Sequence, residues 1–311
     1  MNVSVALATY NGARYLQEQL DSISRQTRPP FEVVASDDGS TDRTVAMLRH
    51  FAEGAPFAVR VHVNERSLGA EENFMRAVRV CRGELVAFSD QDDVWRPAKL
   101  ERCVEPFADP DVQLVVHGWT VVDESLHELD HVSPDRARGK WGQAPGMAMV
   151  FRRSLLDLLA WEDRPPSHEQ GRRLLHDEWV YGLARVSGRV VLVDESLCLY
   201  RQHGANVEGA PDRGLGERGR LALSLGPGYY ARRADQAHAW AGLLAEVDPA
   251  ESAGYARLES AARARSRVYD GDGLRGLMHA MRAGAYRSRR NDGFGLRGFA
   301  RDAFNVVRKG A

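Results

Sequence analysis

The stretch Val3-Ser4-Val5-Ala6-Leu7-Ala8 is a short apolar run, and the polar residues Thr9-Tyr10-Asn11-Gly12 end it. An apolar run of this length with β-branched residues is typical of a strand buried in a parallel sheet. Asn followed by Gly favours a turn. Apolar side chains then recur at helical spacing between Tyr15 and Ile23, so the chain opens with a predicted strand, a polar turn and a helix.

The same order of elements repeats further along the chain. Strands that alternate with helices through short connections predict an α/β domain with a mostly parallel sheet flanked by helices. From Leu221 onward, Ala, Arg and Leu dominate without strand signals, which predicts a helical C-terminal extension. Strands are predicted at 31–35, 59–63, 85–88, 112–117, 121–122, 189–193 and 197–200, and helices around 45–51, 74–81 and 176–183.

Composition places the chain among ordinary globular proteins, since 43% of its 311 residues are hydrophobic, 27% are charged and the net charge is −1. These values exclude collagen-like, disordered and disulfide-stapled chains, and the balanced charge gives no general attraction to nucleic acid. No apolar run approaches the ~20 residues that span a bilayer. Residues 1–9 lack a basic segment and meet the polar Tyr10-Asn11 too soon for a secretory signal, and Cys81, Cys103 and Cys198 lack paired spacing. We therefore expect a cytoplasmic protein with reduced thiols.

Three of the predicted strands end in polar clusters, at 9–11, 37–40 and 90–93. In open α/β sheets, ligands bind beyond the carboxyl ends of the parallel strands. The carboxylates of these clusters are therefore expected to gather on one rim of the sheet. This convergence is the main functional prediction that the residues make by themselves.

The cluster Asp90-Gln91-Asp92-Asp93 places three carboxylates within four positions. They cannot all stay ionised at close range unless a cation or hydrogen-bond donors offset their repulsion. Mg²⁺ or Mn²⁺, held by one or two carboxylates and by substrate phosphates, is one answer. The alternative is a solvated acidic turn that caps a helix starting near Pro97.

Three other polar clusters allow a functional and a structural interpretation. In 37–42, a carboxylate could accept the imide N–H of a pyrimidine or a ribose hydroxyl, or the cluster could simply cap a helix. Asp177 and Glu178 open a helix, where acids complement the dipole, and one of them could take a proton from an attacking hydroxyl. After a strand, Arg201 could hold a phosphate, and His203 could complete a metal shell or be structural.

Five motifs occur in the order Ala8-Thr-Tyr-Asn-Gly12, Ser36-Asp-Asp-Gly-Ser-Thr-Asp42, Phe88-Ser-Asp-Gln-Asp-Asp-Val-Trp95, His176-Asp-Glu-Trp179 and Tyr200-Arg-Gln-His203. Together they carry a resemblance to a known family. They resemble the inverting family 2 glycosyltransferases, which have the GT-A nucleotide-diphospho-sugar transferase fold, and the likeness covers roughly residues 3–206. The third and fifth motifs are particularly similar to rhamnosyltransferase-like members that build O-antigen and other bacterial surface polysaccharides.

The resemblance implies a role for individual residues of the nucleotide site. Thr9, Tyr10 and Asn11 are expected to line the nucleotide pocket, and Asp38 to bind the base, uracil or thymine. Asp90 is expected near the ribose or the donor sugar. The donor is accordingly a dTDP- or UDP-sugar, with rhamnose as one candidate sugar.

The resemblance also implies the metal and the catalytic base. Asp92 is expected to bind the Mg²⁺ or Mn²⁺ ion that bridges the diphosphate, and we group His203 with it. Asp177 matches the catalytic base that activates a hydroxyl of a glycan or lipid-linked acceptor. Glu178 stands where close relatives often have an aromatic residue, which leaves the choice between the two acids open. The nucleotide-binding half is expected at about 1–95, the acceptor half at 96–206, a flexible loop at 207–220 and helices at 221–311.

Two alternatives to a transferase make different demands on the sequence. A sugar-phosphate nucleotidyltransferase would need a Gly-rich, basic phosphate loop after the first strand, and residues 9–14 contain one Gly and one Arg. A non-catalytic sugar-nucleotide-binding protein would have no need to retain the acids at Asp38, Asp90, Asp92 and Asp177.

The charge is uneven along the chain, because 13 Lys and Arg face five Asp and Glu between Arg257 and Ala311. In residues 294–309, apolar and basic residues alternate. This pattern is typical of an amphipathic segment lying on the inner face of an anionic membrane, or of a helix packed on its own domain with a solvated basic face. The second interpretation is favoured, and nucleic-acid binding is the weakest one.

Overall fold

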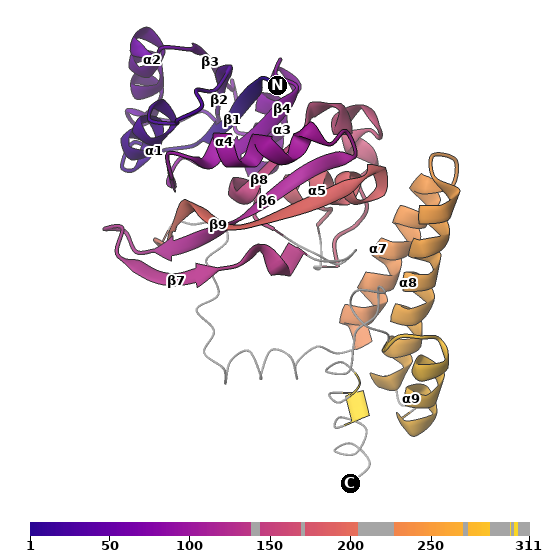
Figure 1. Ribbon diagram of the computed structural model, residues 1–311. Coiled ribbons are helices and arrows are strands. Elements are labelled where there is room, and N and C mark those ends of the chain that lie inside the picture. The colour runs from indigo at the N-terminus through magenta and orange to yellow at the C-terminus, as the bar shows by residue number, and fades with distance from the viewer. Residues whose placement is uncertain are drawn as a thin grey trace. The chain divides into compact units, whose positions relative to one another are not determined.

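A computed structural model describes residues 1–137, 144–168, 172–204, 227–269, 273–286, 299 and 302–303. These residues form two compact units, and Figure 1 shows the chain. The first unit holds the described residues of 1–137, 144–160 and 175–204, and the second holds those of 161–174 and from 227 onward. The loop predicted at 207–220 lies outside the described residues, as does most of the basic segment at 294–309.

The first unit is built on one mixed sheet with the strand order β3-β2-β1-β4-β8-β6-β9-β5, and β7 pairs with β6. The four strands β3, β2, β1 and β4 are mutually parallel, whereas β8 runs antiparallel to β4 and to β6. The strands are β1 Val3–Thr9, β2 Glu32–Asp37, β3 Ala58–Val63, β4 Leu85–Ser89, β5 Val94–Trp95, β6 Val112–Val122, β7 Glu128–Val132, β8 Met149–Arg152 and β9 Arg189–Arg201.

Helices connect and cover these strands, as the strand–helix alternation predicts. α3 packs on β1 and β2, and it also contacts α5. Strands β1, β2 and β4 are buried along their whole length, so their apolar side chains form the centre of the core. The helices of this unit are α1 Leu16–Ser24, α2 Thr44–Gly54, α3 Ala70–Arg79, α4 Lys99–Val104 and α5 His176–Ser187, with short 3₁₀ turns at Glu105–Ala108, Pro134–Ala137, Gly146–Ala148 and Arg153–Asp157. The α/β architecture with a mostly parallel N-terminal half is therefore confirmed.

The strand register confirms that the predicted polar clusters share one rim of the sheet. Thr9 lies opposite Asp37 in the β1–β2 pair. Leu7 lies opposite Ser89 in the β1–β4 pair, so the turn that starts at Asp90 emerges beside Thr9. The ends of three strands thus deliver their side chains to the same edge.

Two of the observed strands are longer than the sequence suggests. β6 and β9 each run without interruption and pair in parallel, although a break was predicted in both. The polar residues 194–196 of β9 are accommodated because the register shifts around Gly118 of β6. A Cβ atom on Gly118 would meet the carbonyl oxygen of Glu195 at 3.1 Å, so a side chain there would crowd the irregularity.

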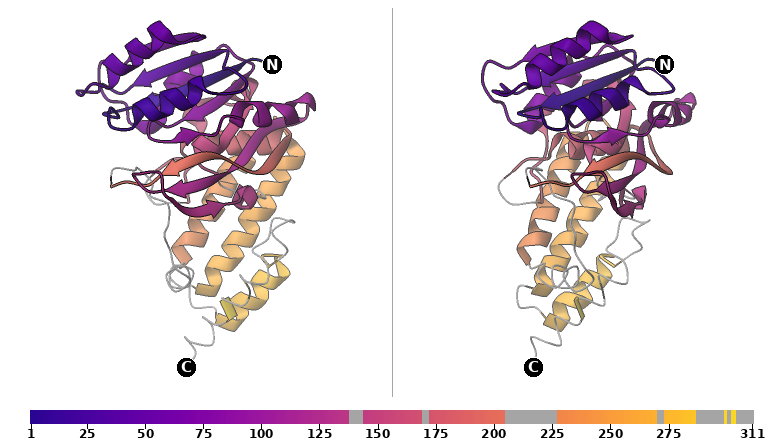
Figure 2. Two further views of the ribbon diagram at one scale, coloured as in Figure 1. Left: turned by 60° about the vertical axis from the view of Figure 1, so that its left-hand side comes forward. Right: turned by 90° about the vertical axis from the view of Figure 1, so that its left-hand side faces the viewer.

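In its described residues, the second unit contains the long helices α7 Pro227–Leu244 and α8 Pro249–Arg267 and the shorter α9 Gly273–Arg282. Both views of Figure 2 show α7 and α8 running alongside each other, and the contacts between them are extensive. Asp248 caps α8 by accepting from the backbone N–H groups of Ala250 and Glu251. The predicted C-terminal helices are therefore confirmed, and none of the helices in the described part of the chain is long and apolar enough to cross a membrane.

Candidate functional site

The turn after β4 is fastened to the loop after β1 by Gln91. Its Oε1 accepts from the backbone N–H of Tyr10 at 2.8 Å, and its Nε2 donates to the carbonyl oxygen of Tyr10 at 3.0 Å. Gly12 makes room for this side chain, since a Cβ atom there would lie 2.0 Å from Gln91 Oε1. The amide therefore holds two of the three predicted polar clusters at a fixed spacing.

Asp92 and His203, the two predicted metal ligands, lie in direct contact. His203 Nε2 is 2.8 Å from Asp92 Oδ2, and the ring of His203 stacks on that of Tyr15 with centroids 4.8 Å apart. The side chains of Asp92 and His203 are 16% and 9% exposed, so the pair is largely shielded from solvent but still accessible from it. The pair joins the turn after β4 to the segment after β9, across 111 positions of the sequence.

The donor set of this pair fits a divalent cation such as Mn²⁺. A carboxylate is the preferred ligand of Mg²⁺ and Mn²⁺, and a neutral imidazole is a common metal ligand. No group of three or more His, Cys, Asp or Glu side chains in the described ranges could hold a metal alone. Substrate oxygens and water would have to complete the coordination shell.

The other acids of the turn are strongly affected by burial. Burial and the neighbouring Asp92 carboxylate raise the pKa of Asp90 to about 7. Burial, with Asp92 and Asp90 nearby, raises the pKa of Asp93 well above its usual range. Lys99 lies close by with no exposed surface, and burial lowers the pKa of its ammonium group. The turn thus concentrates carboxyl groups where negative charge is costly, and a bound cation would offset that cost.

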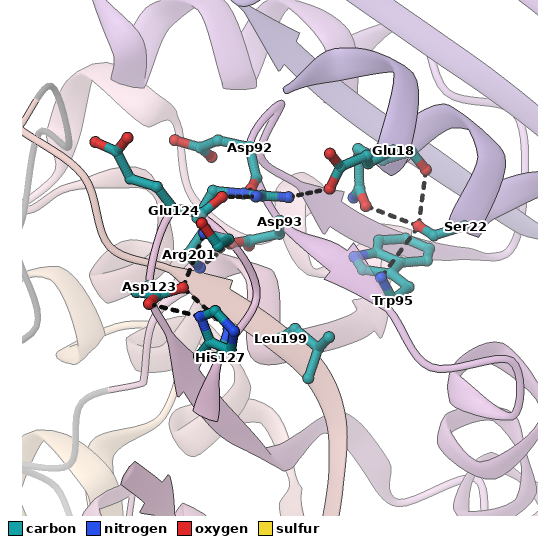
Figure 3. A network of polar contacts seen from close by, with 12 residues as sticks. Glu18, Ser22, Asp92, Asp93, Trp95, Asp123, Glu124, His127, Leu199 and Arg201 are labelled. Atoms are coloured by element: carbon teal, nitrogen blue, oxygen red, sulfur yellow. Dashed lines mark hydrogen bonds and ion pairs between the residues drawn. The ribbon is translucent and has the colours of Figure 1, made fainter. Parts of the chain in front are cut away.

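Arg201 is buried beside this turn, with 1% of its side chain exposed. Nε donates to the carbonyl oxygen of Asp92 at 2.9 Å, Nη1 donates to that of Glu124 at 2.6 Å, and Nη2 pairs with the carboxylate of Glu18. Its backbone N–H also donates to Asp93 at 3.3 Å. Figure 3 shows the guanidinium reaching between Glu18 and Glu124. Arg201 thus connects the end of β9 to the turn after β4, the turn after β6 and helix α1. Its binding of a phosphate stays a prediction.

The predicted base-binding residue, Asp38, is buried and fully engaged with the loop that follows β3. Its carboxylate accepts from Asn64 Nδ2 at 2.7 Å and Ser67 Oγ at 2.6 Å, and from the backbone N–H groups of Leu68 and Gly69 at 2.7 and 3.0 Å. Burial alone would raise the pKa of Asp38, but these hydrogen bonds outweigh it and lower the pKa. Gly69 has φ +86°, a conformation that favours glycine.

We expect Asp38→Asn to lower the free energy of unfolding at pH 7 by about 2 to 3 kcal/mol, because an amide cannot accept from so many donors. A lowered native pKa contributes stability above the unfolded pKa of about 3.9, and this stability is lost as pH falls through the native pKa. The difference between variant and wild type should therefore shrink toward pH 3 in urea titrations. A stability difference that stays constant from pH 7 to pH 3 would contradict a lowered pKa of Asp38. Asp109→Asn, which removes the carboxylate that pairs with Arg189, is the control variant.

The predicted nucleotide-lining residues at the end of β1 and in the loop after it differ in how they are held. Thr9 is buried and donates through Oγ1 to Asp37 at 2.7 Å. Asn11, at φ +46°, accepts through Oδ1 from the backbone N–H of Thr41 at 2.9 Å. The ring of Tyr10 is exposed. A ligand on this rim would therefore meet Tyr10 directly, whereas Thr9 and Asn11 shape the loops around it.

The two acids at the start of α5 have different surroundings. Glu178 reaches back so that Oε2 accepts from the backbone N–H of Leu175 at 2.9 Å, which caps the helix. Asp177 is half-buried, and its Oδ1 accepts from the backbone N–H of Glu178 at 2.7 Å. The neighbouring His176 stacks on Phe74 with centroids 4.2 Å apart, which anchors the helix start to α3.

Several residues of the site were not found by sequence reasoning. Glu18 and Glu124 approach Arg201, and Lys99 lies under the acidic turn with its ammonium 3.6 Å from the centre of the Trp95 ring. Lys99 Nζ also donates to the carbonyl oxygen of Met147 at 2.7 Å. Glu18 lies on a helix with ordinary amphipathic spacing, so no local pattern distinguishes it from a solvated surface acid.

Comparison with known proteins identifies relatives of this arrangement. The model of the family described as Glycosyl transferase family 2 matches residues 4–160, about half of the chain. An uncharacterized glycosyltransferase of Nostoc sp. is 30% identical over 219 residues, which are 66% of this chain and 66% of that protein. The dTDP-rhamnosyl transferase RfbG of Shigella flexneri is 26% identical over 219 residues, which are 66% of this chain and 74% of that one.

A solved structure supports the fold. The S. aureus TarS fragment 1–349, in a complex with UDP-GlcNAc, is similar with a TM-score of 0.56 at 19% sequence identity, covering 100% of this chain and 92% of that one. At this identity the likeness is one of fold, and it matches the GT-A expectation. The aligned region spans 66% of the Nostoc protein and 59% of three mycobacterial relatives.

Proposed function

Because the chain belongs to glycosyl transferase family 2, we propose that it moves a sugar from a nucleoside-diphosphate donor to a hydroxyl of a glycan or lipid-linked acceptor. The contact between Asp92 and His203 carries the proposal, since it unites two predicted ligands from distant parts of the sequence at the sheet rim. The rim also holds Tyr10 and Asp38, which suits a nucleotide lying along it.

The donor that fits best is a dTDP- or UDP-sugar. The Shigella relative is named as a dTDP-rhamnosyl transferase, and the S. aureus structure holds UDP-GlcNAc, which supports both nucleotides. Rhamnose is one candidate sugar. We assign Tyr10 to direct contact with the nucleotide, and Asp38 to holding the 64–69 loop against the base.

A divalent cation on Asp92 and His203 would neutralise charge on the diphosphate leaving group. The chain's own contribution is to hold these ligands in place, because Arg201 ties the Asp92 backbone to Glu124 and Glu18. Asp90, half-buried and next to Asp92, is assigned to the ribose or donor-sugar side of the site.

Asp177 is the catalytic base of the proposed reaction. The acceptor hydroxyl is a poor nucleophile until a base takes its proton. The carboxylate of Glu178 caps its own helix, which leaves Asp177 as the acid with this role. One direct displacement then inverts the anomeric carbon, and the nucleoside diphosphate leaves without a covalent enzyme intermediate.

Replacing Asp92 by Ala tests the metal assignment. We expect Mn²⁺ to tighten binding of UDP or dTDP to the wild type by about tenfold or more, and to have no effect on the variant's affinity. Isothermal titration calorimetry with Mn²⁺ and with EDTA measures both. Asp109→Ala removes an exposed acid and should keep the metal response. An unchanged metal response in Asp92→Ala would place the metal elsewhere.

A sugar-phosphate nucleotidyltransferase would consume a nucleoside triphosphate and a sugar 1-phosphate and release pyrophosphate. The transferase proposal predicts no such release when these compounds are supplied. Pyrophosphate formation at a rate that depends on Asp92 would favour the alternative over the proposed reaction.

A further inference from the structure

Arg14 and Glu124 form an ion pair beside the proposed donor site. Arg14 Nη2 lies 2.6 Å from Glu124 Oε2, although 110 residues separate the two. Arg14 lies in the loop after β1, and Glu124 lies in the turn between β6 and β7. The side chains are 69% and 44% exposed, so an exchange of partners costs little, since exposed ion pairs contribute about 0 to 1 kcal/mol.

The ring of Tyr15 connects this pair to the Asp92–His203 contact. The guanidinium carbon of Arg14 is 4.9 Å from the centre of the Tyr15 ring, and the His203 ring stacks on the same ring at 4.8 Å. His203 in turn contacts Asp92. Arg14 and His203 therefore lie against the same aromatic ring, so that one ring separates the exposed side chain of Arg14 from the His203–Asp92 contact.

Glu124 is also tied to Asp92 through Arg201. The guanidinium of Arg201 donates both to the carbonyl oxygen of Glu124 and to that of Asp92. Figure 3 shows Glu124 next to Arg201 and Asp92 in this network. The turn that carries Glu124 is thus fixed relative to the acidic turn, which makes Glu124 a defined holding position for Arg14.

Besides the divalent cation proposed at Asp92 and His203, a diphosphate bound there would gain from a positively charged side chain that it can reach. Glu18, Asp92 and Glu124 are acids, and the guanidinium of Arg201 is 1% exposed and held by carbonyl oxygens and Glu18. Arg14, in contrast, is exposed and ends in a planar guanidinium that can donate two parallel hydrogen bonds to phosphate oxygens.

On the basis of the proposed function, we infer that Arg14 binds the diphosphate of the donor and that Glu124 holds Arg14 in the free protein. The donor's phosphate oxygens replace the Glu124 carboxylate as the partner of the guanidinium. Glu124 therefore competes with the ligand and weakens its binding, which favours release of the nucleoside diphosphate after transfer.

Calorimetric titrations of UDP and dTDP, and of uridine and thymidine, into single and double variants test this inference. Arg14→Gln should lower the affinity for the diphosphate about tenfold or more. Glu124→Gln should raise it about two- to fivefold, because the competing carboxylate is gone. Adding Glu124→Gln to Arg14→Gln should change nothing further, and the affinity for the nucleosides should be the same in all variants.

Arg189→Gln and Asp109→Asn are matched controls, since they break an exposed Arg–Asp pair at the opposite end of β9. They should leave diphosphate affinity unchanged. If Glu124→Gln still raises diphosphate affinity in the Arg14→Gln background, Glu124 repels the diphosphate directly. That result would overturn the proposed exchange of partners at Arg14. Equal losses of affinity for nucleoside and diphosphate would make the pair structural. If the wild type binds neither diphosphate, the proposed function fails, and the inference fails with it.

Discussion

Asp177→Asn is expected to reduce sugar transfer by at least about 100-fold while nucleoside-diphosphate affinity stays within about twofold of the wild type. General base catalysis contributes about 10² to 10⁴ in rate, and an amide cannot take the acceptor proton. Asp177 acts on the acceptor rather than the nucleotide, so binding should be spared. Transfer is measured by release of UDP or dTDP in the presence of acceptor, and binding by calorimetry on the same preparation.

Glu178→Gln is the matched control for this prediction. A glutamine can still accept from the Leu175 N–H and keep the helix cap that the structure shows. This variant should therefore retain transfer within a fewfold of wild type. The opposite result, loss of transfer in Glu178→Gln and retention in Asp177→Asn, would move the base to Glu178.

Arg265→Met is expected to destabilise the C-terminal unit by about 3 to 5 kcal/mol, because it leaves a buried carboxylate without its cation. Arg265 and Asp302 are 1% and 0% exposed, and Nε donates to the carboxylate at 2.6 Å. The hydroxyls of Tyr269 and Tyr286 donate to the same carboxylate. Hydrogen exchange of the α8 amides measures the effect, because local opening reports the loss of protection there.

Arg263→Met supplies the control two residues away on the same helix. Arg263 is 49% exposed and pairs with Glu259 and Asp235 on the surface. Its removal should cost no more than about 1 kcal/mol. Equal loss of protection in both variants would show that the buried pair is no more important than a surface one.

The central strands of the sheet could be predicted because the signal lies in their own residues and needs no distant partner. The strands β1, β2 and β4 are short, mainly apolar runs, and such runs are typical of strands that are covered on both faces of a sheet. Parallel pairing then places the polar residues that follow each run on one edge, and the register of Thr9 against Asp37 confirms it.

Features that depend on distant partners were harder to predict. Polar residues 194–196 look like the end of a strand, but Gly118 on the neighbouring strand lets β9 continue past them. The motif around Arg201 indicates a cation near the site, yet the direction of its side chain depends on Glu18, 183 residues away. The Arg14–Glu124 pair joins two exposed turns and leaves no periodic signal.

The contact between Asp92 and His203 depends on distant partners but could still be predicted. No spacing rule connects residues 111 positions apart. Only the family resemblance, which assigns both motifs to one site, predicts that they meet. The roles of Thr9, Tyr10, Asn11, Asp38, Asp90 and Asp177 in binding and catalysis stay predictions, and the Asp177 variant above tests the last of them.

Calorimetric titration of UDP and dTDP into the wild-type protein, with Mn²⁺ and then with EDTA, tests the central claim most directly. The account predicts binding of at least one of them, strengthened by Mn²⁺ and weakened by EDTA, and a preference between the two would identify the donor class. Absence of binding by both nucleotides to the folded protein would contradict the proposed dTDP- or UDP-sugar donor site.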